Sequence, residues 1–189
     1  MAKPTLVVVN GPPGSGKTTL AHALARAIPC PAICRDEIKE GLVHTEQPET
    51  LTPGDTITRR TFETFFAALE LYLRAGVTIV AEAAFQHRLW EPHLTPLADI
   101  AQLRLIRCVV DAATARERIV RRTTEDVTTR ASHQDRWLLE QLDGGKMKLE
   151  DFYHVEMDVP MVIVDTTNAY EPAFNEIVAF ATEANATRS

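Results

Sequence analysis

One glycine-rich stretch near the start of the chain restricts the fold more than any other feature. Residues 11–18 follow the pattern G-x-x-x-x-G-K-S/T, which is typical of a phosphate-binding P-loop. The apolar, mostly β-branched run 6–9 before it predicts a buried strand, and apolar residues at helical spacing follow at residues 20–28. Because N–H groups at a helix start are unpaired and the dipole is positive there, this strand, loop and helix predict a phosphate site.

The residue types in this loop suit a nucleotide. The glycines allow positive φ and a close approach of the backbone to phosphate oxygens. The Lys17 ammonium is expected to reach the β- and γ-phosphates, and the Thr18 hydroxyl to bind Mg²⁺. The sequence has no guanine-recognition motif of the Asn/Thr-Lys-x-Asp type, so ATP is favoured. The predicted ATP-binding residues in this stretch are Gly11, Pro12, Pro13, Gly14, Ser15, Gly16, Lys17, Thr18 and Thr19.

The composition fits a single domain spanning residues 1–189. The net charge of −6 argues against broad electrostatic binding to nucleic acid. No apolar run approaches the roughly 20 residues that span a bilayer, and the first strand pattern starts too early to leave room for a signal peptide. Three cysteines fit a reducing compartment, and Cys30, Cys34 and Cys108 are expected to be buried thiols rather than metal ligands. We therefore expect a cytoplasmic protein without a membrane partner.

Strand and helix patterns alternate along the chain. This alternation predicts an α/β fold of the P-loop NTPase type, with a five-stranded parallel sheet between helices. The predicted strands are 5–10, 31–35, 77–81, 103–110 and 161–164. The predicted helices are 17–28, 36–42, 58–75, 88–98 (broken by Pro92 and Pro96), 112–122, 132–142 and 171–182, with a loop at 44–55. A small helical lid is expected at about residues 112–135.

Asp36 follows the second predicted strand, and ligands of open α/β sheets bind beyond the carboxyl ends of strands. Transfer of a phosphoryl group to a hydroxyl needs an acceptor for its proton, and a carboxylate near the γ-phosphate can orient that hydroxyl. Asp is also common at helix N-caps. Lys39 stands three residues on, where a capping box would have Glu or Gln. We therefore predict that Asp36 is the catalytic base, with capping alone as the alternative.

Four residues are predicted to serve the substrate. Arg35 and Lys39 flank Asp36 and either hold an anionic substrate group or are solvated charges. Glu82 comes at the end of the third predicted strand, where it would hold a Mg²⁺-bound water or a substrate hydroxyl, or form a half-buried ion pair. Arg88 is the fourth. The predicted acceptor pocket consists of Phe85, His87, Arg88, Trp90 and the loop 44–55.

Three arginines, Arg118, Arg121 and Arg122, fall at helical spacing on one face of the predicted helix 112–122. Arginines on a lid would neutralise the charge of ATP during transfer, although a solvated face is the plainer alternative. We predict that Arg118 and Arg122 bind the nucleotide and that Arg122 is catalytic, together with Lys17. Asp111 is expected to cap this helix. The turn 165–168 either passes beside the adenine or is only a turn.

Taken together, these residues resemble the P-loop kinases of the polynucleotide kinase, zeta toxin and chloramphenicol phosphotransferase group, the AAA-domain kinases. The resemblance covers nearly the whole chain. Its carriers are the motif at residues 11–19, Arg35-Asp36-Glu37, Val80-Ala81-Glu82, Arg118-x-x-Arg121-Arg122 and Val164-Asp165-Thr166-Thr167. It implies that Asp36 is the base, that Lys39 touches the acceptor side, and that Arg118 and Arg122 contact ATP or its γ-phosphate.

One departure from this group concerns the acceptor. Polynucleotide kinases of the group have Asp followed by small polar residues after the third strand, whereas this chain has Glu82 followed by Ala-Ala-Phe. A small-molecule hydroxyl is therefore the expected acceptor in an ATP- and Mg²⁺-dependent phosphotransfer. The alternatives are a nucleotide-dependent binding module or ATPase switch, a kinase of nucleoside or nucleic-acid 5′-hydroxyls, and a toxin-like kinase of cell-wall sugar nucleotides. The sequence leaves the oligomeric state open.

Overall fold

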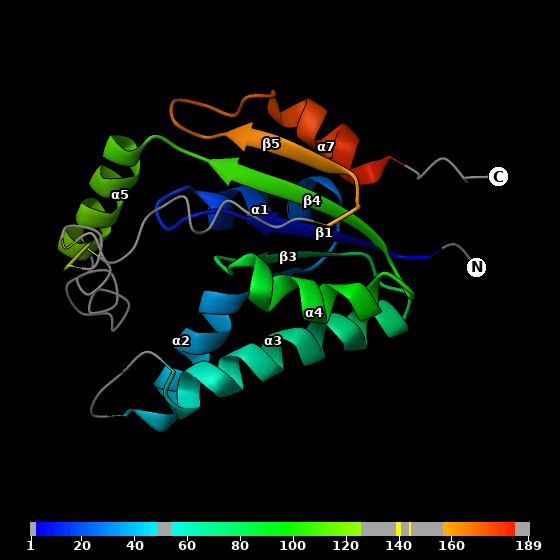
Figure 1. Ribbon diagram of the computed structural model, residues 1–189, viewed down its shortest axis with the longest axis horizontal. Helices are drawn as coiled ribbons and strands as arrows, with labels where there is room; N and C mark the ends of the chain where they lie inside the picture. Colours follow the sequence, from blue (N-terminus) through cyan, green and yellow to red (C-terminus); the bar gives the residue numbers. More distant parts are fainter. Residues whose placement is uncertain (1–2, 49–53, 126–138, 141–143, 145–156, 184–189) are drawn as a thin grey trace.

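A computed structural model describes residues 3–48, 54–125, 139–140, 144 and 157–183. Five parallel strands form one sheet in the order β2-β3-β1-β4-β5. Their bounds are β1 Thr5–Asn10, β2 Ala32–Cys34, β3 Ile79–Ala83, β4 Gln102–Val109 and β5 Met161–Asp165. Figure 1 shows the strands running side by side, with their carboxyl ends toward the same edge. The predicted α/β P-loop fold is confirmed.

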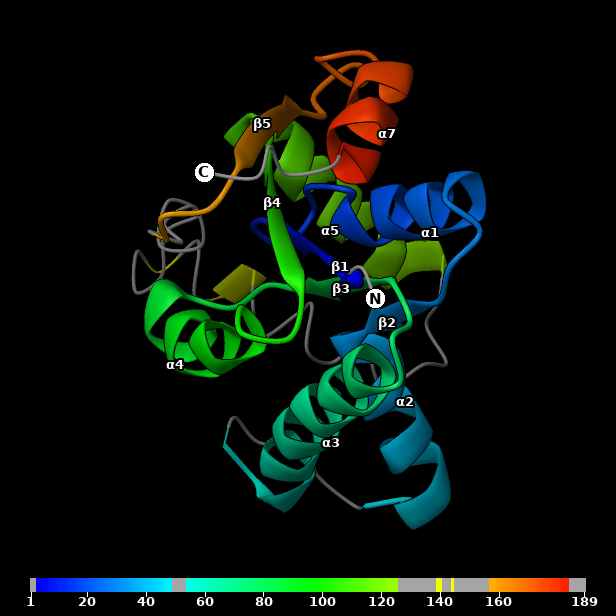
Figure 2. The same cartoon turned by 90° about the vertical axis from the view of Figure 1, so that its right-hand side faces the viewer.

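Helices cover both faces of the sheet (Figures 1 and 2). Helices α3 (Thr56–Arg74) and α4 (His87–Leu97) pack on one face, and α1 (Lys17–Ala27) and α7 (Phe174–Thr182) pack on the other. Alternate residues of β1 point to opposite faces. Leu6 and Val8 join the core under α3 and α4, whereas Val7 and Val9 join the core under α1 and α7. Burial on both faces explains the unbroken apolar run that predicts β1.

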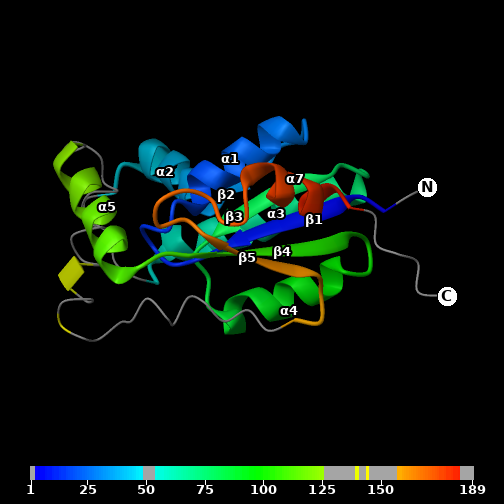
Figure 3. The ribbon, with the colours of Figure 1, turned by 90° about the horizontal axis from the view of Figure 1, so that it is seen from above.

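Two further helices lie near the carboxyl edge of the sheet. Helix α2 (Arg35–Glu46) follows β2 directly and packs against α3, and α5 (Ala112–Glu125) follows β4. Seen from above, α5 stands beyond the ends of the strands, with α2 toward the same end (Figure 3). Among the described residues, no helix is both long and apolar enough to cross a membrane.

Several element bounds differ from the prediction, for identifiable reasons. The first part of the expected loop 44–55 is helical, because α2 continues to Glu46 before the left-handed residue Gln47 ends it. Helix α4 is not broken at Pro92 and Pro96. Each proline removes one backbone donor, but burial of Trp90, Leu94 and Leu97 holds the helix against the sheet.

The third strand and the last helix both begin later than predicted. Strand β3 is shifted from the predicted 77–81 to Ile79–Ala83. It therefore includes Glu82, which pairs in register with Val9 and Cys34 on either side. Helix α7 starts at Phe174 instead of residue 171, because Glu171 forms two backbone hydrogen bonds with Asp165. Most of the predicted helix 132–142 and residues 126–135 of the expected lid lie outside the described residues.

Candidate active site

The loop between β1 and α1 has glycine where a side chain would collide. A Cβ atom on Gly11 would lie 2.7 Å from the carbonyl oxygen of Cys108 in β4. Gly14 has a φ of +79°, and a Cβ atom there would lie 2.6 Å from the carbonyl oxygen of Ala115 in α5. Gly16, with a φ of +70°, is the N-cap of α1. Strand β4 and helix α5 therefore pack closely on the loop.

We expect Gly14→Ala to destabilise the fold more than Gly76→Ala. Both glycines have a φ of +79°, but a Cβ atom on Gly76 would meet nothing within 4 Å. The left-handed backbone alone costs an alanine about 1–2 kcal/mol, and the collision with Ala115 adds about 1–3 kcal/mol at position 14. Urea unfolding of the two variants measures the difference. Equal losses of unfolding free energy would show that α5 does not press on the loop.

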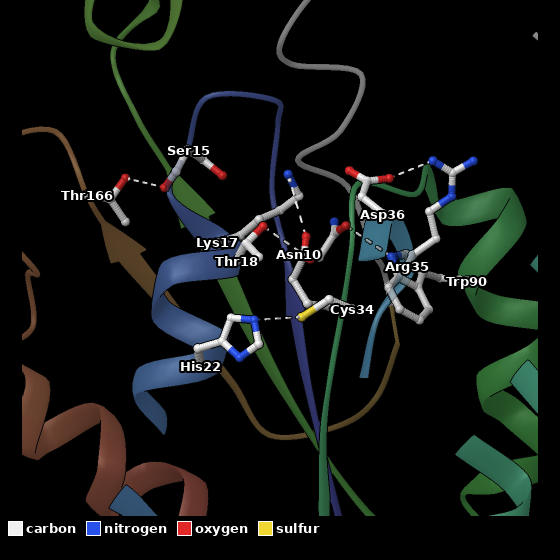
Figure 4. Close-up of polar contacts among 11 residues, drawn as sticks. Asn10, Ser15, Lys17, Thr18, His22, Cys34, Arg35, Asp36, Trp90 and Thr166 are labelled. Atoms are coloured by element: carbon white, nitrogen blue, oxygen red, sulfur yellow. Dashed lines mark hydrogen bonds and ion pairs between the residues drawn. The ribbon is translucent and has the colours of Figure 1, made fainter. Parts of the chain in front are cut away.

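Side chains from distant segments hold the loop from outside. Thr166, just after β5, donates from Oγ1 to the Ser15 carbonyl oxygen at 2.7 Å (Figure 4). Arg118 of α5 donates to the Thr166 carbonyl oxygen at 2.7 Å and to the Gly14 carbonyl oxygen at 3.3 Å. The buried Ser15 hydroxyl itself has no hydrogen-bond partner within the described part of the chain. Buried polar groups are almost always paired, so the missing partner of this hydroxyl indicates that the loop binds a ligand.

Lys17 and Thr18 both contact Glu82 of β3. The Lys17 Nζ atom lies 3.6 Å from Glu82 Oε1, and the Thr18 hydroxyl donates to Glu82 Oε2 at 3.2 Å. Lys17 is 7% exposed and Glu82 is 1% exposed. The structure thus brings three predicted site residues together at the carboxyl ends of β1 and β3, and the half-buried ion pair considered for Glu82 is present as a fully buried one.

The environment of Glu82 disfavours its charge. Burial raises the pKa of the Glu82 carboxyl, the nearby Asp36 charge raises it further, and Lys17 partly opposes both effects. A cation bound beside Glu82 would favour the ionised form. The carboxylate is therefore placed where an additional positive charge would stabilise it.

Asp36 lies in the first turn of α2, one residue after the helix begins. The N-cap position of α2 is Cys34, so the capping alternative does not hold. Partial desolvation of the Asp36 carboxyl would raise its pKa, but the charges of Arg35 and then Lys17 outweigh this effect and hold that pKa below its usual range. The Arg35 guanidinium donates to Asp36 Oδ1 at 2.6 Å, and the Asp36 side chain is 60% exposed. Asp36 is thus an accessible, ionised carboxylate, and Figure 4 shows it paired with Arg35.

The other two predicted substrate residues differ in their surroundings. Lys39 is buried on α2, and burial followed by repulsion from Arg35 lowers its pKa, against the attraction of Asp55 and Asp36. Arg88 is exposed at the start of α4, where its Nε donates to Gln86. No hydrogen bond or ion pair between described residues joins Arg88 to Asp36 or Lys39. The structure therefore groups Lys39 and Arg35 around Asp36, whereas the hydrogen bond of Arg88 is with Gln86.

Helix α5 begins as predicted. Asp111 accepts a hydrogen bond from the Thr114 N–H at 2.9 Å, which confirms Asp111 as the cap. A side-chain hydrogen bond with Thr114, and after it this backbone bond, lowers the pKa of Asp111. Arg122 is exposed one turn beyond Arg118 on the same helix. In the loop segment itself, Pro12 and Pro13 precede Gly14, and Thr19 is exposed on α1.

Two contacts that support the site were not predicted from the sequence. Asn10 is buried at the end of β1 and accepts a hydrogen bond from the Trp90 indole at 3.0 Å. Trp90 is fully buried and Phe85 nearly so, hence both belong to the core under α4 and not to an acceptor pocket. The other contact joins Thr166, in the predicted turn 165–168, to the Ser15 carbonyl oxygen. The signal for Asn10 was a polar residue ending a buried strand, because such a group needs a partner.

Comparison with known families assigns the chain to one of them. The family model described as AAA domain matches residues 6–144. The chain belongs to the AAA domain family. The AAA-domain match includes the loop, Asp36, Glu82 and both predicted lid arginines. No curated protein sequence matches this AAA-domain chain.

Solved structures share the fold of this AAA-domain protein. A candidate kinase from Chloroflexus aurantiacus matches with a TM-score of 0.76 and 24% identity, over 94% of this chain and 93% of its own. An APS kinase from Mycobacterium tuberculosis, solved with AMPPNP and APS, matches with a TM-score of 0.63 and 13% identity, over 97% and 100%. A gluconokinase from Sinorhizobium meliloti matches with a TM-score of 0.54 and 20% identity, over 95% and 89%. The predicted resemblance to P-loop kinases is confirmed at the level of the fold.

Proposed function

We propose that this protein is an ATP- and Mg²⁺-dependent phosphotransferase whose acceptor is a hydroxyl of a small molecule. The observation that carries the proposal is an accessible, ionised Asp36 at the same sheet edge as Lys17 and Thr18 of the phosphate-binding loop. An APS kinase and a gluconokinase are among the proteins that share the fold, which supports a small acceptor. Nucleic acid is the less favoured acceptor because the chain carries a net charge of −6.

The loop fits a triphosphate on its own geometry. Gly11 and Gly14 leave no room for side chains against β4 and α5, and the buried Ser15 hydroxyl of the loop lacks a partner among the described residues. Residues 11–19, with Arg118 and Arg122, would hold the nucleotide. Thr18 would bind Mg²⁺, and Glu82, an oxygen donor 3.2 Å from the Thr18 hydroxyl, would support the ion. Bound Mg²⁺ neutralises charge on the phosphates.

The residues of the chain have distinct tasks in this reaction. Lys17 stabilises charge on the transferring phosphoryl group, and Arg118 keeps the loop fixed through Gly14 and Thr166. As the acceptor oxygen bonds to phosphorus and the bond to ADP breaks, the hydroxyl proton passes to Asp36. A carboxylate with a lowered pKa is a weak base. Because the transition state of phosphoryl transfer is loose, orienting the hydroxyl matters more than basicity.

A transfer assay with labelled ATP tests the proposal. The purified full chain is incubated with [γ-³²P]ATP, Mg²⁺ and separate pools of sugars, sugar acids, nucleosides and 5′-hydroxyl oligonucleotides. We expect label to appear in one or more of the small-molecule pools. Label only on oligonucleotides would move the acceptor class to nucleic acid. Binding of ATP without transfer to any pool would support the nucleotide-dependent switch instead.

We expect Glu82→Gln to raise the Mg²⁺ concentration that gives half-maximal transfer by about tenfold, because an amide replaces an anionic oxygen beside Thr18. The KM for the acceptor should change little. Glu70→Gln, an exposed α3 residue paired with Arg74, is the control and should change neither value. A raised acceptor KM with an unchanged Mg²⁺ requirement would assign Glu82 to the substrate hydroxyl.

A further inference from the structure

A second set of ligating side chains meets where α1, β2 and α2 come together. His22 of α1, Cys34 at the end of β2 and Glu37 of α2 each offer one atom, and these three atoms lie within 4.8 Å of one another. His22 Nε2 is 2.6 Å from Glu37 Oε1 and 3.7 Å from Cys34 Sγ. Figure 4 shows the His22 ring directed at the Cys34 sulfur. The proposed phosphotransfer uses none of these three side chains.

The spacing suits a tetrahedral metal ion. Bonds of about 2.3 Å to sulfur and 2.0–2.2 Å to nitrogen and oxygen place the ligands of Zn²⁺ roughly 3.3–3.6 Å apart. The distance of 3.7 Å between Cys34 Sγ and His22 Nε2 is about 0.1 Å longer than this range. The oxygen of Glu37 would have to move away from His22 by about 0.7 Å, and the Glu37 side chain is 51% exposed and therefore able to shift. An ordinary hydrogen bond beside a core thiol is the competing explanation.

We propose that His22, Cys34 and Glu37 form a binding site for Zn²⁺ or a similar transition-metal ion. The mixed sulfur, nitrogen and oxygen donors select such an ion over Mg²⁺, which prefers oxygen alone. His22 is 36% exposed, whereas Cys34 is buried, so the ion enters from solvent with the sulfur beneath it. The S–H proton leaves to the buffer as the Zn–S bond forms. Three protein ligands leave a fourth position for water.

This site is separate from the nucleotide site but adjoins it. Cys34 pairs in register with Glu82 in the neighbouring strand and immediately precedes Arg35 and Asp36. Helix α1 carries Lys17 and Thr18 as well as His22. A bound ion therefore joins the helix of the phosphate-binding loop to the helix of Asp36. Spacing in the sequence could not show this, because His22 is 12 residues from Cys34.

The test uses the untagged, reduced full chain without nucleotide and with excess Mg²⁺. Zn²⁺ is titrated calorimetrically, and Co²⁺ is added separately as a spectroscopic probe. We expect one Zn²⁺ per chain and a thiolate-to-cobalt charge-transfer band in the near ultraviolet. His22→Ala and Glu37→Ala, both at partly exposed positions, should each weaken Zn²⁺ binding by about tenfold or more, and Cys34→Ser should abolish the band.

Cys30→Ser is the matched control, since it removes a partly buried thiol four residues away that is not in the cluster. It should leave the affinity and the band unchanged. The proposal is overturned if no stoichiometric binding occurs, if His22→Ala binds Zn²⁺ as the wild type does, or if Cys30→Ser removes the band. Thermal unfolding in the presence of a chelator checks that every variant is folded. None of these readouts depends on phosphotransfer, so this proposal and the proposed function can fail independently.

Discussion

Lys17→Met is expected to lower kcat/KM for phosphotransfer by about 10³-fold or more. Preorganised donors aimed at developing charge are worth about 10²–10³ each, and Lys17 would bring a full positive charge to the γ-phosphate. Lys17 is the first residue of α1, and only 7% of it is exposed to solvent. Lys3→Met removes an exposed lysine near the N-terminus and should leave the rate unchanged. A rate for Lys17→Met within tenfold of wild type would remove Lys17 from the mechanism.

The same substitution should also destabilise the protein without nucleotide, by about 3 kcal/mol, because it leaves the buried Glu82 without its cation. Burial already raises the pKa of Glu82, and loss of Lys17 raises it further. A folded-state pKa above the unfolded value means that stability is lost as the pH rises through the folded pKa. The deficit of Lys17→Met should therefore grow from acidic to neutral pH.

The double variant Lys17→Met/Glu82→Gln separates folding from chemistry. It removes the unpaired buried charge and should recover most of the lost unfolding free energy. Its phosphotransfer should stay as low as that of Lys17→Met. Urea unfolding and the labelled-ATP assay measure the two quantities. If the double variant is as unstable as the single one, the contact between Lys17 and Glu82 is not what stabilises this edge of the sheet.

The sequence predicts well what depends on local pattern. The loop, β1 and α1 follow from glycine spacing and apolar periodicity within residues 5–28. Asp111 could be predicted as a cap because its partner, the Thr114 N–H, is three residues away. The placement of Asp36 next to the loop follows from a general rule, that the carboxyl ends of parallel strands meet at one edge.

Contacts between residues far apart in the chain could not be predicted from the local sequence pattern. Thr166 reaches Ser15, and Trp90 reaches Asn10, across 151 and 80 residues respectively. The register that sets Glu82 beside Cys34 depends on strand pairing, which apolar periodicity does not fix for a strand buried on both faces. The two prolines of α4 wrongly predict a broken helix for a related reason. Contacts with the rest of the fold bury one side of α4 and hold it together, and local sequence does not show such contacts.

Asp36→Asn is expected to lower kcat by about 10²–10⁴-fold. The amide keeps the size of the side chain but cannot take up the acceptor proton, while the phosphate-binding loop is untouched. Affinity for ATP should therefore change little, as measured by calorimetric titration. Glu40→Gln removes another exposed acid from α2 and should retain activity. Weakened ATP binding with normal turnover would contradict the assignment of Asp36 as the base.

The role of Asp36 also fixes the direction of a pH effect. Arg35 and Lys17 hold the pKa of Asp36 below its usual range, so wild-type activity should persist as the pH falls and decline only when Asp36 takes up a proton. Arg35→Gln removes the cation that donates to Asp36 Oδ1. Desolvation of the carboxyl then has less opposition, so the pKa of Asp36 should rise and the acid limb of kcat/KM should move to higher pH. A limb that stays in place in Arg35→Gln would show that another group controls it, and a limb that disappears in Asp36→Asn would identify Asp36 directly.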